Sequence, residues 1–464
     1  MNKEKLLTYL NYFLVVCCGI GAFWLASNNI IFAKNPGQPF EMWQMLICAP
    51  IVIGLFAAVI AINIKRKLYK PNYVIIGLLG LLFIINMISV LAYKNGTVYD
   101  FMSADRANNY SITVAFTAQE RVVAIFSFMG VMLGALLLLD ILHQVTDLNN
   151  DIKIACLVVI TIAIIAIIYG LIKFPNRYFL LYKHLTDGQL YHASIPSFFQ
   201  TKNEYALILY LAVLAGIYLH HYYRKWYWLL GSVYAYINII HTLSKQMIII
   251  GALTMLAYLI CIFFTTYKQH KKMNIIALAS IGGTIALAVI AGLIYLGVTG
   301  KFQALADTIY FTKGSDTFQT RTYIWEKVLV IINANNWSRG TGHILFGNIL
   351  HTMNALDVSA GEATARYSAH CAYLQYIGEG GILLLTIELA ILGYAIYFGV
   401  RFFKENKELV VLCFAIITLF LAIMFFESAS IGISFTLDYA IITLFSVVPL
   451  IDLGRKNNKI FLGK

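Results

Sequence analysis

The feature that most limits how this chain can fold is a series of long apolar runs with short polar segments between them. A helix needs about 20 mostly apolar residues to cross the hydrocarbon core of a bilayer. We identify twelve segments of this kind, at 6–32, 43–64, 72–93, 119–145, 153–173, 203–220, 226–243, 246–267, 274–299, 370–400, 408–427 and 431–451. The pattern predicts an all-α, polytopic integral membrane protein with about 12 transmembrane helices.

Composition excludes several other classes of protein. Of the 464 residues, 60% are hydrophobic and only 12% are charged, whereas a soluble domain has about 25% charged residues. A soluble fold of this length could not bury so much apolar surface, which excludes a cytosolic enzyme, a disordered protein and a disulfide scaffold. A transmembrane β-barrel is disfavoured, because barrel strands alternate polar and apolar residues. The seven cysteines form no C-x-x-C pair and lie mostly in apolar runs, so we interpret them as small core residues.

The distribution of Lys and Arg predicts the orientation, because short cytoplasmic loops carry an excess of them. One side of the predicted bundle holds Lys3, Lys5, Lys65, Arg66, Lys67, Lys70, Lys153, Arg224, Lys225, Lys268, Lys271, Lys272, Arg401, Lys404, Lys407, Arg455, Lys456, Lys459 and Lys464. Both termini are therefore expected in the cytoplasm, in agreement with an even number of spans. The net charge of +12 then reflects topology and contact with anionic membrane lipid, and nucleic acid is not an expected partner.

Three longer segments, 94–118, 174–202 and 301–369, lie on the outer side in this topology. We therefore divide the chain into transmembrane helices 1–9 at 1–300, an extracytoplasmic loop at 301–369, and helices 10–12 with a cytoplasmic tail at 370–464. Within the loop, the stretch 318–332 carries apolar residues at helical spacing, namely Ile324, Trp325, Val328, Leu329 and Ile332. We expect an amphipathic helix there, lying on the membrane or on the helix bundle.

Two cations are predicted at outer helix ends, where charged residues are costly and often functional. Lys245 follows Ser244 in a turn so short that Lys245 must begin the next helix. Its ammonium either projects into the outer mouth of the bundle or snorkels to the interface. Arg321 opens the amphipathic helix, where it opposes the helix dipole and so does not serve helix stability. It either joins the dipole in attracting an anion such as phosphate, or it is a solvated arginine near lipid phosphates.

A glycine pair follows in the same loop, within Ser338-Arg339-Gly340-Thr341-Gly342-His343. Two glycines separated by one residue permit a tight turn with exposed backbone N–H groups, and such a nest can hold an anion. We therefore take Arg339, Gly340, Gly342 and His343 as candidate substrate-binding residues. The alternative is an ordinary turn.

The end of the loop re-enters the membrane at His370. On a helix, His370, Tyr373 and Leu374 would share one face. A neutral imidazole at the wet mouth of a bundle can take a proton from a hydroxyl near pH 7, although a lone histidine is often structural. Glu379, about two and a half turns deeper, is the strongest intramembrane carboxylate, which either contacts substrate or pairs with a cation inside the bundle.

The sequence contains none of the spacings typical of metal or nucleotide sites. The ten histidines show no H-x-x-x-H or H-E-x-x-H pattern, and neither a Walker A nor a Rossmann fingerprint occurs. We expect no metal and no cofactor.

In order and spacing, these groups resemble the O-antigen ligase and polymerase family, which includes the Wzy-type polysaccharide polymerases. The resemblance rests on Ser244-Lys245, Arg321-x-x-x-Trp325, Gly340-Thr341-Gly342, His370-Cys371-Ala372-Tyr373-Leu374, and Glu379 with Gly381. Lys245 stands where the family pattern has Arg, which keeps the charge but loses the bidentate fork. Cys371 stands where the pattern has Asn.

The resemblance implies a GT-C-like membrane glycosyltransferase in a bacterial cytoplasmic (inner) membrane, with an extracytoplasmic active site. The donor would be an oligosaccharide on undecaprenyl pyrophosphate and the acceptor a second glycan, with a chain-length regulator as a further partner. Lys245 and Arg321 would neutralise the pyrophosphate leaving group, and His370 would orient or deprotonate the attacking hydroxyl. Fixed cations would make a metal unnecessary. Arg339, Gly340, Gly342, His343, Tyr373, Trp325 and Glu379 would bind substrate.

The acceptor separates two functions within this family. A polymerase for capsule, exopolysaccharide or O-antigen extends another lipid-linked repeat unit, whereas a ligase transfers the glycan to lipid A core or to a protein. By analogy with divergent family members, and because of Lys245, we favour a polymerase. A flippase or other transporter of lipid-linked oligosaccharide is a rival class, although it predicts short loops and internal repeats. A scaffold that regulates polysaccharide export is another.

Overall fold

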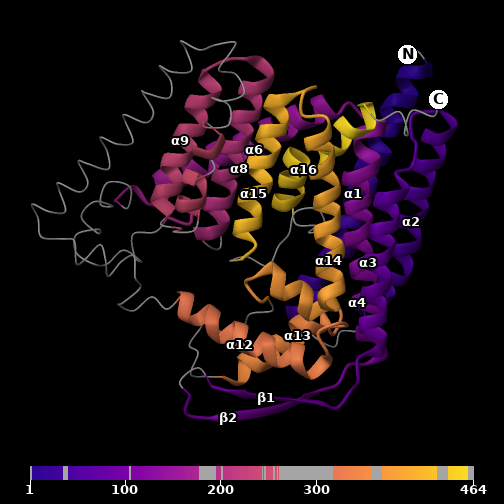
Figure 1. Cartoon of the computed structure of the whole chain (residues 1–464), viewed down its shortest axis with the longest axis vertical. Helices are drawn as coiled ribbons and strands as arrows, with labels where there is room; N and C mark the ends of the chain where they lie inside the picture. Colours follow the sequence, from indigo (N-terminus) through magenta and orange to yellow (C-terminus); the bar gives the residue numbers. More distant parts are fainter. Residues whose placement is uncertain are drawn as a thin grey trace, which may run out of the picture. The chain divides into compact units, whose positions relative to one another are not determined.

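The computed structural model is mostly helical (Figure 1), and it describes residues 3–34, 40–103, 106–176, 195–199, 202–242, 244, 247–253, 256–258, 260, 317–357, 368–425 and 437–457. The chain divides into two compact units. Unit 1 comprises Met1–Asp151, Phe318–Phe402 and Phe420–Lys464, and unit 2 comprises Ile152–Thr317 and Phe403–Leu419.

Long helices form the body of unit 1. They are α1 (Lys3–Lys34), α2 (Phe40–Lys65), α3 (Tyr73–Ala92), α4 (Ala118–Leu136), α14 (Ala372–Arg401) and α16 (Leu437–Asn457). The helix α4 continues through a π-helix, η1 (Leu137–Leu142), into the short α5 (His143–Val145). Helix α1 packs against α2 and α4, and α14 packs against α3 and α16.

Local sequence explains where two of these helices begin. The side chain of Asn72 caps α3 by accepting a hydrogen bond from the backbone N–H of Ile75 (3.3 Å). Thr117 and Glu120 form a capping box at the start of α4, in which the Glu120 carboxylate also accepts from the Thr117 N–H (2.7 Å).

A layer of short elements covers the end of unit 1 where α3 ends and α4 begins. It contains the antiparallel hairpin of β1 (Thr97–Met102) and β2 (Asn109–Val114), and the helices α12 (Thr317–Asn335) and α13 (Leu345–Leu356), drawn below the long helices in Figure 1. Tyr99, Phe101 and Ile112 face inward from the two strands. They join a buried cluster with Val328 of α12 and Leu350 of α13, so the hairpin and both helices share one core.

Two predictions are refined here. The helix expected at 318–332 is present as α12, but it packs on protein: Ile324, Val328 and Ile332 are buried in the shared core, whereas Leu329 is exposed. The hairpin within the segment 94–118 was not predicted from the sequence. Only Tyr99, Phe101 and Ile112 are buried in its two six-residue strands, so the alternation rests on three residues and is weak.

Unit 2 contains α6 (Leu148–Lys173), α8 (Lys202–Tyr223), α9 (Tyr227–Thr242) and most of α15 (Lys407–Ile423). The helices α8 and α9 pack closely, and the Ser232 hydroxyl of α9 donates to the Val213 carbonyl of α8 (2.9 Å). At one end of this unit, Glu408 forms ion pairs with Arg224 (2.5 Å) and His221 (3.3 Å).

Seven helices in the described part of the chain are long and apolar enough to cross a membrane, which agrees with a polytopic membrane protein. They span Lys5–Ala26, Met45–Lys65, Tyr73–Ala92, Ala118–Val145, Leu148–Lys173, Lys202–Tyr223 and Ala372–Arg401. Helices also occur at three further predicted spans, as α9, α15 and α16. The predicted span 274–299 lies outside the described residues and 246–267 lies partly outside them, so a total of about twelve stays a prediction.

Candidate active site

A chain of hydrogen bonds connects three of the predicted site residues in unit 1. The Trp325 indole N–H of α12 donates to the Ala369 carbonyl (3.0 Å), and the Ala369 N–H donates to the Gln375 side chain (2.9 Å). Gln375 in turn donates to Glu379 Oε1 (2.5 Å), and the other oxygen of Glu379 bonds His343 Nδ1 (2.9 Å). This network joins α12, the segment before α14, α14 itself and the loop between α12 and α13.

Arg321 lies one turn before Trp325 on the same side of α12, because residues four apart stack on a helix. Only 8% of Arg321 is exposed, and its neighbour Ile324 belongs to the shared core. A guanidinium keeps its charge even when buried. Trp325 binds the backbone beside His370. The fixed positive charge of Arg321 therefore lies on the part of α12 that contacts the His370 segment.

His370 does not lie on a helix, contrary to the prediction. The helix α14 begins at Ala372 with Cys371 as its N-cap, and His370 has a positive φ of 48°. This left-handed conformation is uncommon for residues other than glycine, although histidine adopts it more often than most. His370 is held from both sides, since Ala369 is fully buried and the Ala372 N–H donates to the Met424 carbonyl (2.7 Å).

The expected shared face of His370, Tyr373 and Leu374 is therefore absent. Tyr373 stands in the first turn of α14, and its hydroxyl donates to the Leu421 carbonyl (2.8 Å) while its ring packs against Phe425.

Cys371, the residue between His370 and the first turn of α14, is buried. Burial raises the pKa of the Cys371 thiol. This cysteine is consequently a neutral packing residue near pH 7 rather than a nucleophile.

The glycine pair forms a tight turn, but its N–H groups do not make the expected anion nest. Thr341 N–H donates to the Gly378 carbonyl (2.9 Å), Gly342 N–H to the Glu379 carbonyl (2.6 Å), and Gly340 N–H to the Asn336 carbonyl (3.3 Å). Two of these three donors therefore bind α14. Gly342, at φ 103°, lies so close to α3 that an added Cβ would be 2.3 Å from the Val90 side chain.

Two of the candidate residues around this turn make specific contacts. The His343 ring lies against Phe128, with centroids 5.2 Å apart, and the His343 N–H donates to the Asn86 side chain of α3 (2.7 Å). Arg339 is half-buried, and among the described residues its Nε atom has no hydrogen-bond partner. Its carbonyl accepts from the Ser89 hydroxyl (2.5 Å). Arg339 is thus a second cation on a backbone that is fixed to α3.

Glu379 is only 5% exposed and is satisfied within the protein. Of the two alternatives for this carboxylate, the structure favours the one in which it pairs with a potential cation, His343. Glu379 also accepts from Gln375, whose other contact fixes the backbone next to His370. Its position fits a residue that holds the site together.

Lys245 lies outside the described residues. Its neighbour Ser244 is buried, and the Ser244 hydroxyl donates to the Asn203 side chain in unit 2 (2.9 Å).

A buried ion pair beside the site was not predicted from the sequence. Lys327 of α12 is 3% exposed, and its ammonium binds Asp357 (2.8 Å) and the Asn354 side chain (3.0 Å). One sequence signal was available: Lys327 follows Ile324 by three residues and precedes Ile331 by four, so it shares the apolar face of α12. A charge within an apolar stripe indicates a buried partner.

The described residues contain no group of three or more His, Cys, Asp or Glu side chains that could hold a metal ion. The described cations of the site are Arg321 and Arg339, and a guanidinium binds phosphate oxygens well because it offers two parallel N–H donors. The arrangement can hold an anion near α12 and present a polar group at His370.

Comparison with known protein families gives a match to the family described as O-antigen ligase, over residues 230–389. The matched segment contains Lys245, Arg321, the glycine turn, His370 and Glu379. No curated protein and no solved structure matches the chain. The match over residues 230–389 supports an assignment of this segment to the O-antigen ligase and polymerase family, whose members are enzymes.

Proposed function

We propose that this protein is a polysaccharide polymerase, which joins oligosaccharide repeat units carried on undecaprenyl pyrophosphate. The observation that carries the proposal is the family match over residues 230–389. In this segment Arg321 is buried one helical turn before Trp325, and Trp325 contacts the backbone beside His370. A fixed cation and a potential base on joined elements are what transfer from a pyrophosphate donor requires.

The proposed reaction is a displacement at the anomeric carbon of the donor sugar. A hydroxyl of the acceptor glycan attacks that carbon, a new C–O bond forms, and the bond to pyrophosphate breaks. Undecaprenyl pyrophosphate leaves with the bonding electrons, and the hydroxyl proton passes to His370 or through it to water. Arg321 neutralises the charge that grows on the pyrophosphate, a role that a fixed cation can fill without a metal.

Gln375 and Glu379 act as positioning residues in this proposal. They touch neither substrate nor leaving group, but Gln375 accepts from the Ala369 N–H and so fixes the backbone beside His370. The positive φ of His370 is a strained conformation, which persists only where neighbouring contacts enforce it. The network from Trp325 to His343 provides such contacts.

We place the site on the outer face of a bacterial cytoplasmic membrane, with both termini inside. The hairpin, α12 and α13 cover the end of unit 1 where α3 ends and α4 begins. The segment Lys65-Arg66-Lys67 lies at the opposite end of these helices, as does Arg455 at the end of α16. Positively charged loops favour the cytoplasmic side, which leaves the covered end for the outside.

The direct test is glycan transfer in liposomes that contain the full chain and a lipid-linked repeat unit. A polymerase produces a ladder of longer lipid-linked glycans that survives EDTA and is lost in Arg321→Gln and His370→Ala. Arg106→Gln is the matched control, because Arg106 is half-exposed in its ion pair with Glu326 near the same elements. Flipping of labelled lipid without chain growth would instead support a transporter.

A ligase remains the second candidate function, and the description of the matched family as O-antigen ligase is the observation in its favour. The two functions share the donor and differ in the acceptor. Liposomes supplied with donor alone separate them: chain growth requires a polymerase, whereas product that forms only when lipid A core or an acceptor protein is added requires a ligase.

A further inference from the structure

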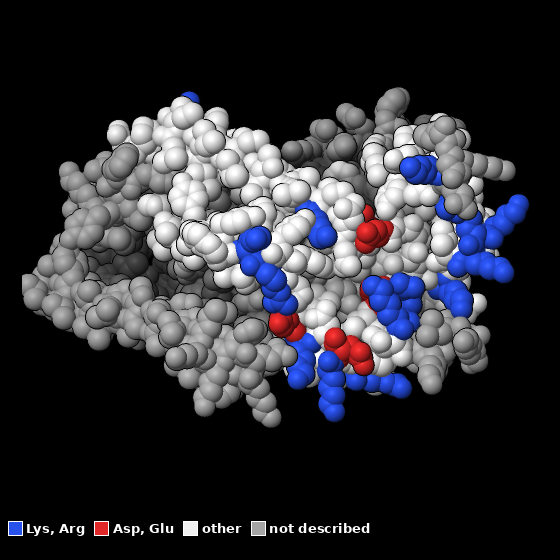
Figure 2. Space-filling view, turned by 90° about the horizontal axis from the view of Figure 1, so that it is seen from above, with Lys and Arg blue, Asp and Glu red and all other residues white. Residues whose placement is uncertain are grey.

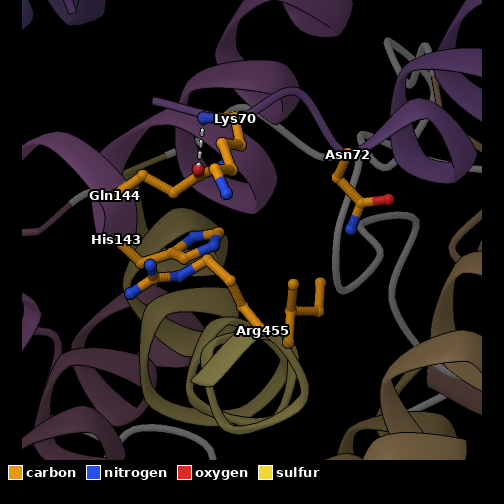
Figure 3. Close-up of a pocket in the computed structure, with 6 residues that line it drawn as sticks. Lys70, Asn72, His143, Gln144 and Arg455 are labelled. Atoms are coloured by element: carbon orange, nitrogen blue, oxygen red, sulfur yellow. Dashed lines mark hydrogen bonds between the residues drawn. The ribbon is translucent and has the colours of Figure 1, made fainter. Parts of the chain in front are cut away.

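A small polar pocket lies in unit 1 at the end opposite the hairpin, α12 and α13. Lys70, Asn72, His143, Gln144, Ile451 and Arg455 line it (Figure 3). Three separate elements meet there: the connection between α2 and α3, the short helix α5, and the end of α16. Figure 2 looks onto this end of the helices and shows lysine and arginine side chains on its surface.

The wall of the pocket is built by a hydrogen-bonded network around Asp140, which lies in the π-helix η1. The fully buried Asp140 carboxylate accepts from the Tyr69 hydroxyl (2.5 Å) and the Asn72 N–H (3.1 Å). The Gln144 amide donates to Asp140 (3.1 Å) and accepts from the Lys70 N–H (3.0 Å). π-Helical turns are rare and occur frequently at functional sites.

His143 follows the π-helix and lines the pocket with a polar atom that the protein leaves unused. The residue is only 4% exposed, and its Nδ1 has no hydrogen-bond partner among the described residues. A buried polar group of this kind carries a desolvation cost unless something binds it. Its ring lies next to the Arg455 side chain in Figure 3.

The charges at the pocket are mostly positive. Lys70 and Arg455 line it, and Lys456 follows on the same helix turn. Two acidic residues also lie there: Asp140 in the wall, and Asp452, which binds both Arg455 (2.9 Å) and Lys456 (2.5 Å). The enclosed space is about 10 Å³, enough for one water-sized atom group. An anion can therefore insert only a single oxygen and must leave its remainder at the mouth.

We propose that this pocket binds a phosphate group, with one oxygen against His143 and the others against Lys70 and Arg455. A neutral imidazole with its proton on Nδ1 donates to such an oxygen, while the guanidinium offers paired N–H donors. The phosphate belongs either to the headgroup of an anionic phospholipid or to a free phosphate ester. By joining α5 and α16 to the α2–α3 connection, the ligand stabilises unit 1 at the end away from the proposed active site.

The test measures thermal unfolding of the full chain in a non-ionic detergent, titrated with inorganic phosphate against chloride at equal ionic strength. A ligand that binds only the folded state raises the unfolding temperature in proportion to its occupancy. Lys70→Gln and Arg455→Gln should each weaken the apparent Kd for phosphate about tenfold. Lys65→Gln is the matched control, because it removes a cation at the end of α2 that does not line the pocket.

The source of the phosphate is resolved by repeating the titration in phosphatidylcholine nanodiscs with and without phosphatidylglycerol. Loss of the phosphate response in the presence of phosphatidylglycerol assigns the pocket to a lipid headgroup, and an unchanged response assigns it to a free phosphate ester. The proposal is overturned if chloride acts as well as phosphate, or if Lys65→Gln weakens binding as much as the two pocket variants. Glycan transfer is not part of the readout, so the result is independent of the proposed function.

Discussion

At the residue scale, the ordering of the site depends on side chains that never need to touch substrate. Glu379 binds His343 and Gln375, and Gln375 binds the backbone next to His370. In a buried site, removing one partner of a charged hydrogen bond leaves the other polar group unsatisfied. The consequences of substitution at Glu379 should therefore be seen in stability as well as in activity.

Glu379→Gln keeps the shape of the side chain but removes its charge, so we expect the free energy of unfolding to fall by about 1.5–3 kcal/mol. Denaturant titration in detergent measures this free energy of unfolding. Glu326→Gln is the control, because Glu326 is about half-exposed and its pair with Arg106 should contribute at most about 1 kcal/mol. Equal losses in the two variants would mean that the Glu379 network does not stabilise the site.

His370→Ala should lower the initial rate of transfer about 10²- to 10⁴-fold if the imidazole handles the proton of the acceptor hydroxyl. A radiolabelled donor in liposomes gives that rate. Gln375→Ala should lower it less, because Gln375 acts only through the backbone beside His370. A His370→Ala variant that retains the wild-type rate would remove His370 from the mechanism.

The sequence indicates candidate site residues but not the contacts between them. The family match spans the residues chosen from charge, helix ends and motif order. The pairing of Glu379 with His343, 36 positions apart, could not be predicted, because local spacing carries no information about which distant turn approaches a helix. The glycine pair was interpreted as an anion nest for the same reason: the carbonyl groups that occupy two of its donors belong to α14.

At the scale of elements, the turn between α12 and α13 is locked onto α14 and α3 by close backbone contact. The turn donates to the carbonyls of Gly378 and Glu379, and Gly342 abuts Val90. Gly381 kinks α14 at the same place, with a φ of 73°. These approaches explain why α12 and α14, far apart in sequence, are held together in one unit.

Gly342→Ala should destabilise the protein by more than about 1 kcal/mol, since alanine at a positive φ is strained and its Cβ would lie 2.3 Å from the Val90 side chain. Gly393→Ala in α14 is the control, because no atom lies within 4 Å of the added Cβ there. It should be neutral or stabilising by about 0.5–1 kcal/mol. Thermal unfolding of both variants in detergent measures the difference, and a stable Gly342→Ala variant would contradict the locked turn.

Lys327→Met tests whether the buried ion pair ties α12 to the end of α13. The variant leaves Asp357 buried without its cation, so unfolding free energy should fall by about 3–5 kcal/mol. Adding Asp357→Asn should recover part of the loss, because the uncompensated charge disappears. Denaturant titration of the single and double variants measures both unfolding free energies. A double variant no more stable than Lys327→Met would show that the pair has another role.

Elements with strong periodicity were predicted well and short ones poorly. The apolar runs anticipated the long helices, and the spacing at 318–332 anticipated α12. The hairpin was missed, and so was the partner of α12, because amphipathicity shows that a face is covered without showing by what. The charge of Lys327 within the apolar face of α12 could have indicated that this face packs on protein rather than on the membrane.

At the scale of the whole molecule, an active site on the outer face requires one orientation of the chain in the membrane. Single cysteines placed in a cysteine-free background, at Lys67 and at Asn109, should be modified by a membrane-impermeant thiol reagent from the inside and from the outside, respectively. Lys67 follows α2, and Asn109 begins β2. Both positions are exposed, so each reports the side of the membrane on which it lies. Labelling of Asn109→Cys from the cytoplasmic side would place the proposed active site on the wrong face.

In the proposed function, the family segment catalyses glycan transfer with Arg321 as a fixed cation for the pyrophosphate. The most direct measurement is the initial rate of undecaprenyl pyrophosphate release in liposomes, for Arg321→Gln beside Arg106→Gln. Loss of a charge that stabilises the leaving group should lower the rate about 10²- to 10³-fold, while the exposed Arg106 should change it little. An Arg321→Gln rate equal to that of Arg106→Gln would contradict the role of Arg321 as the cation that stabilises the leaving group.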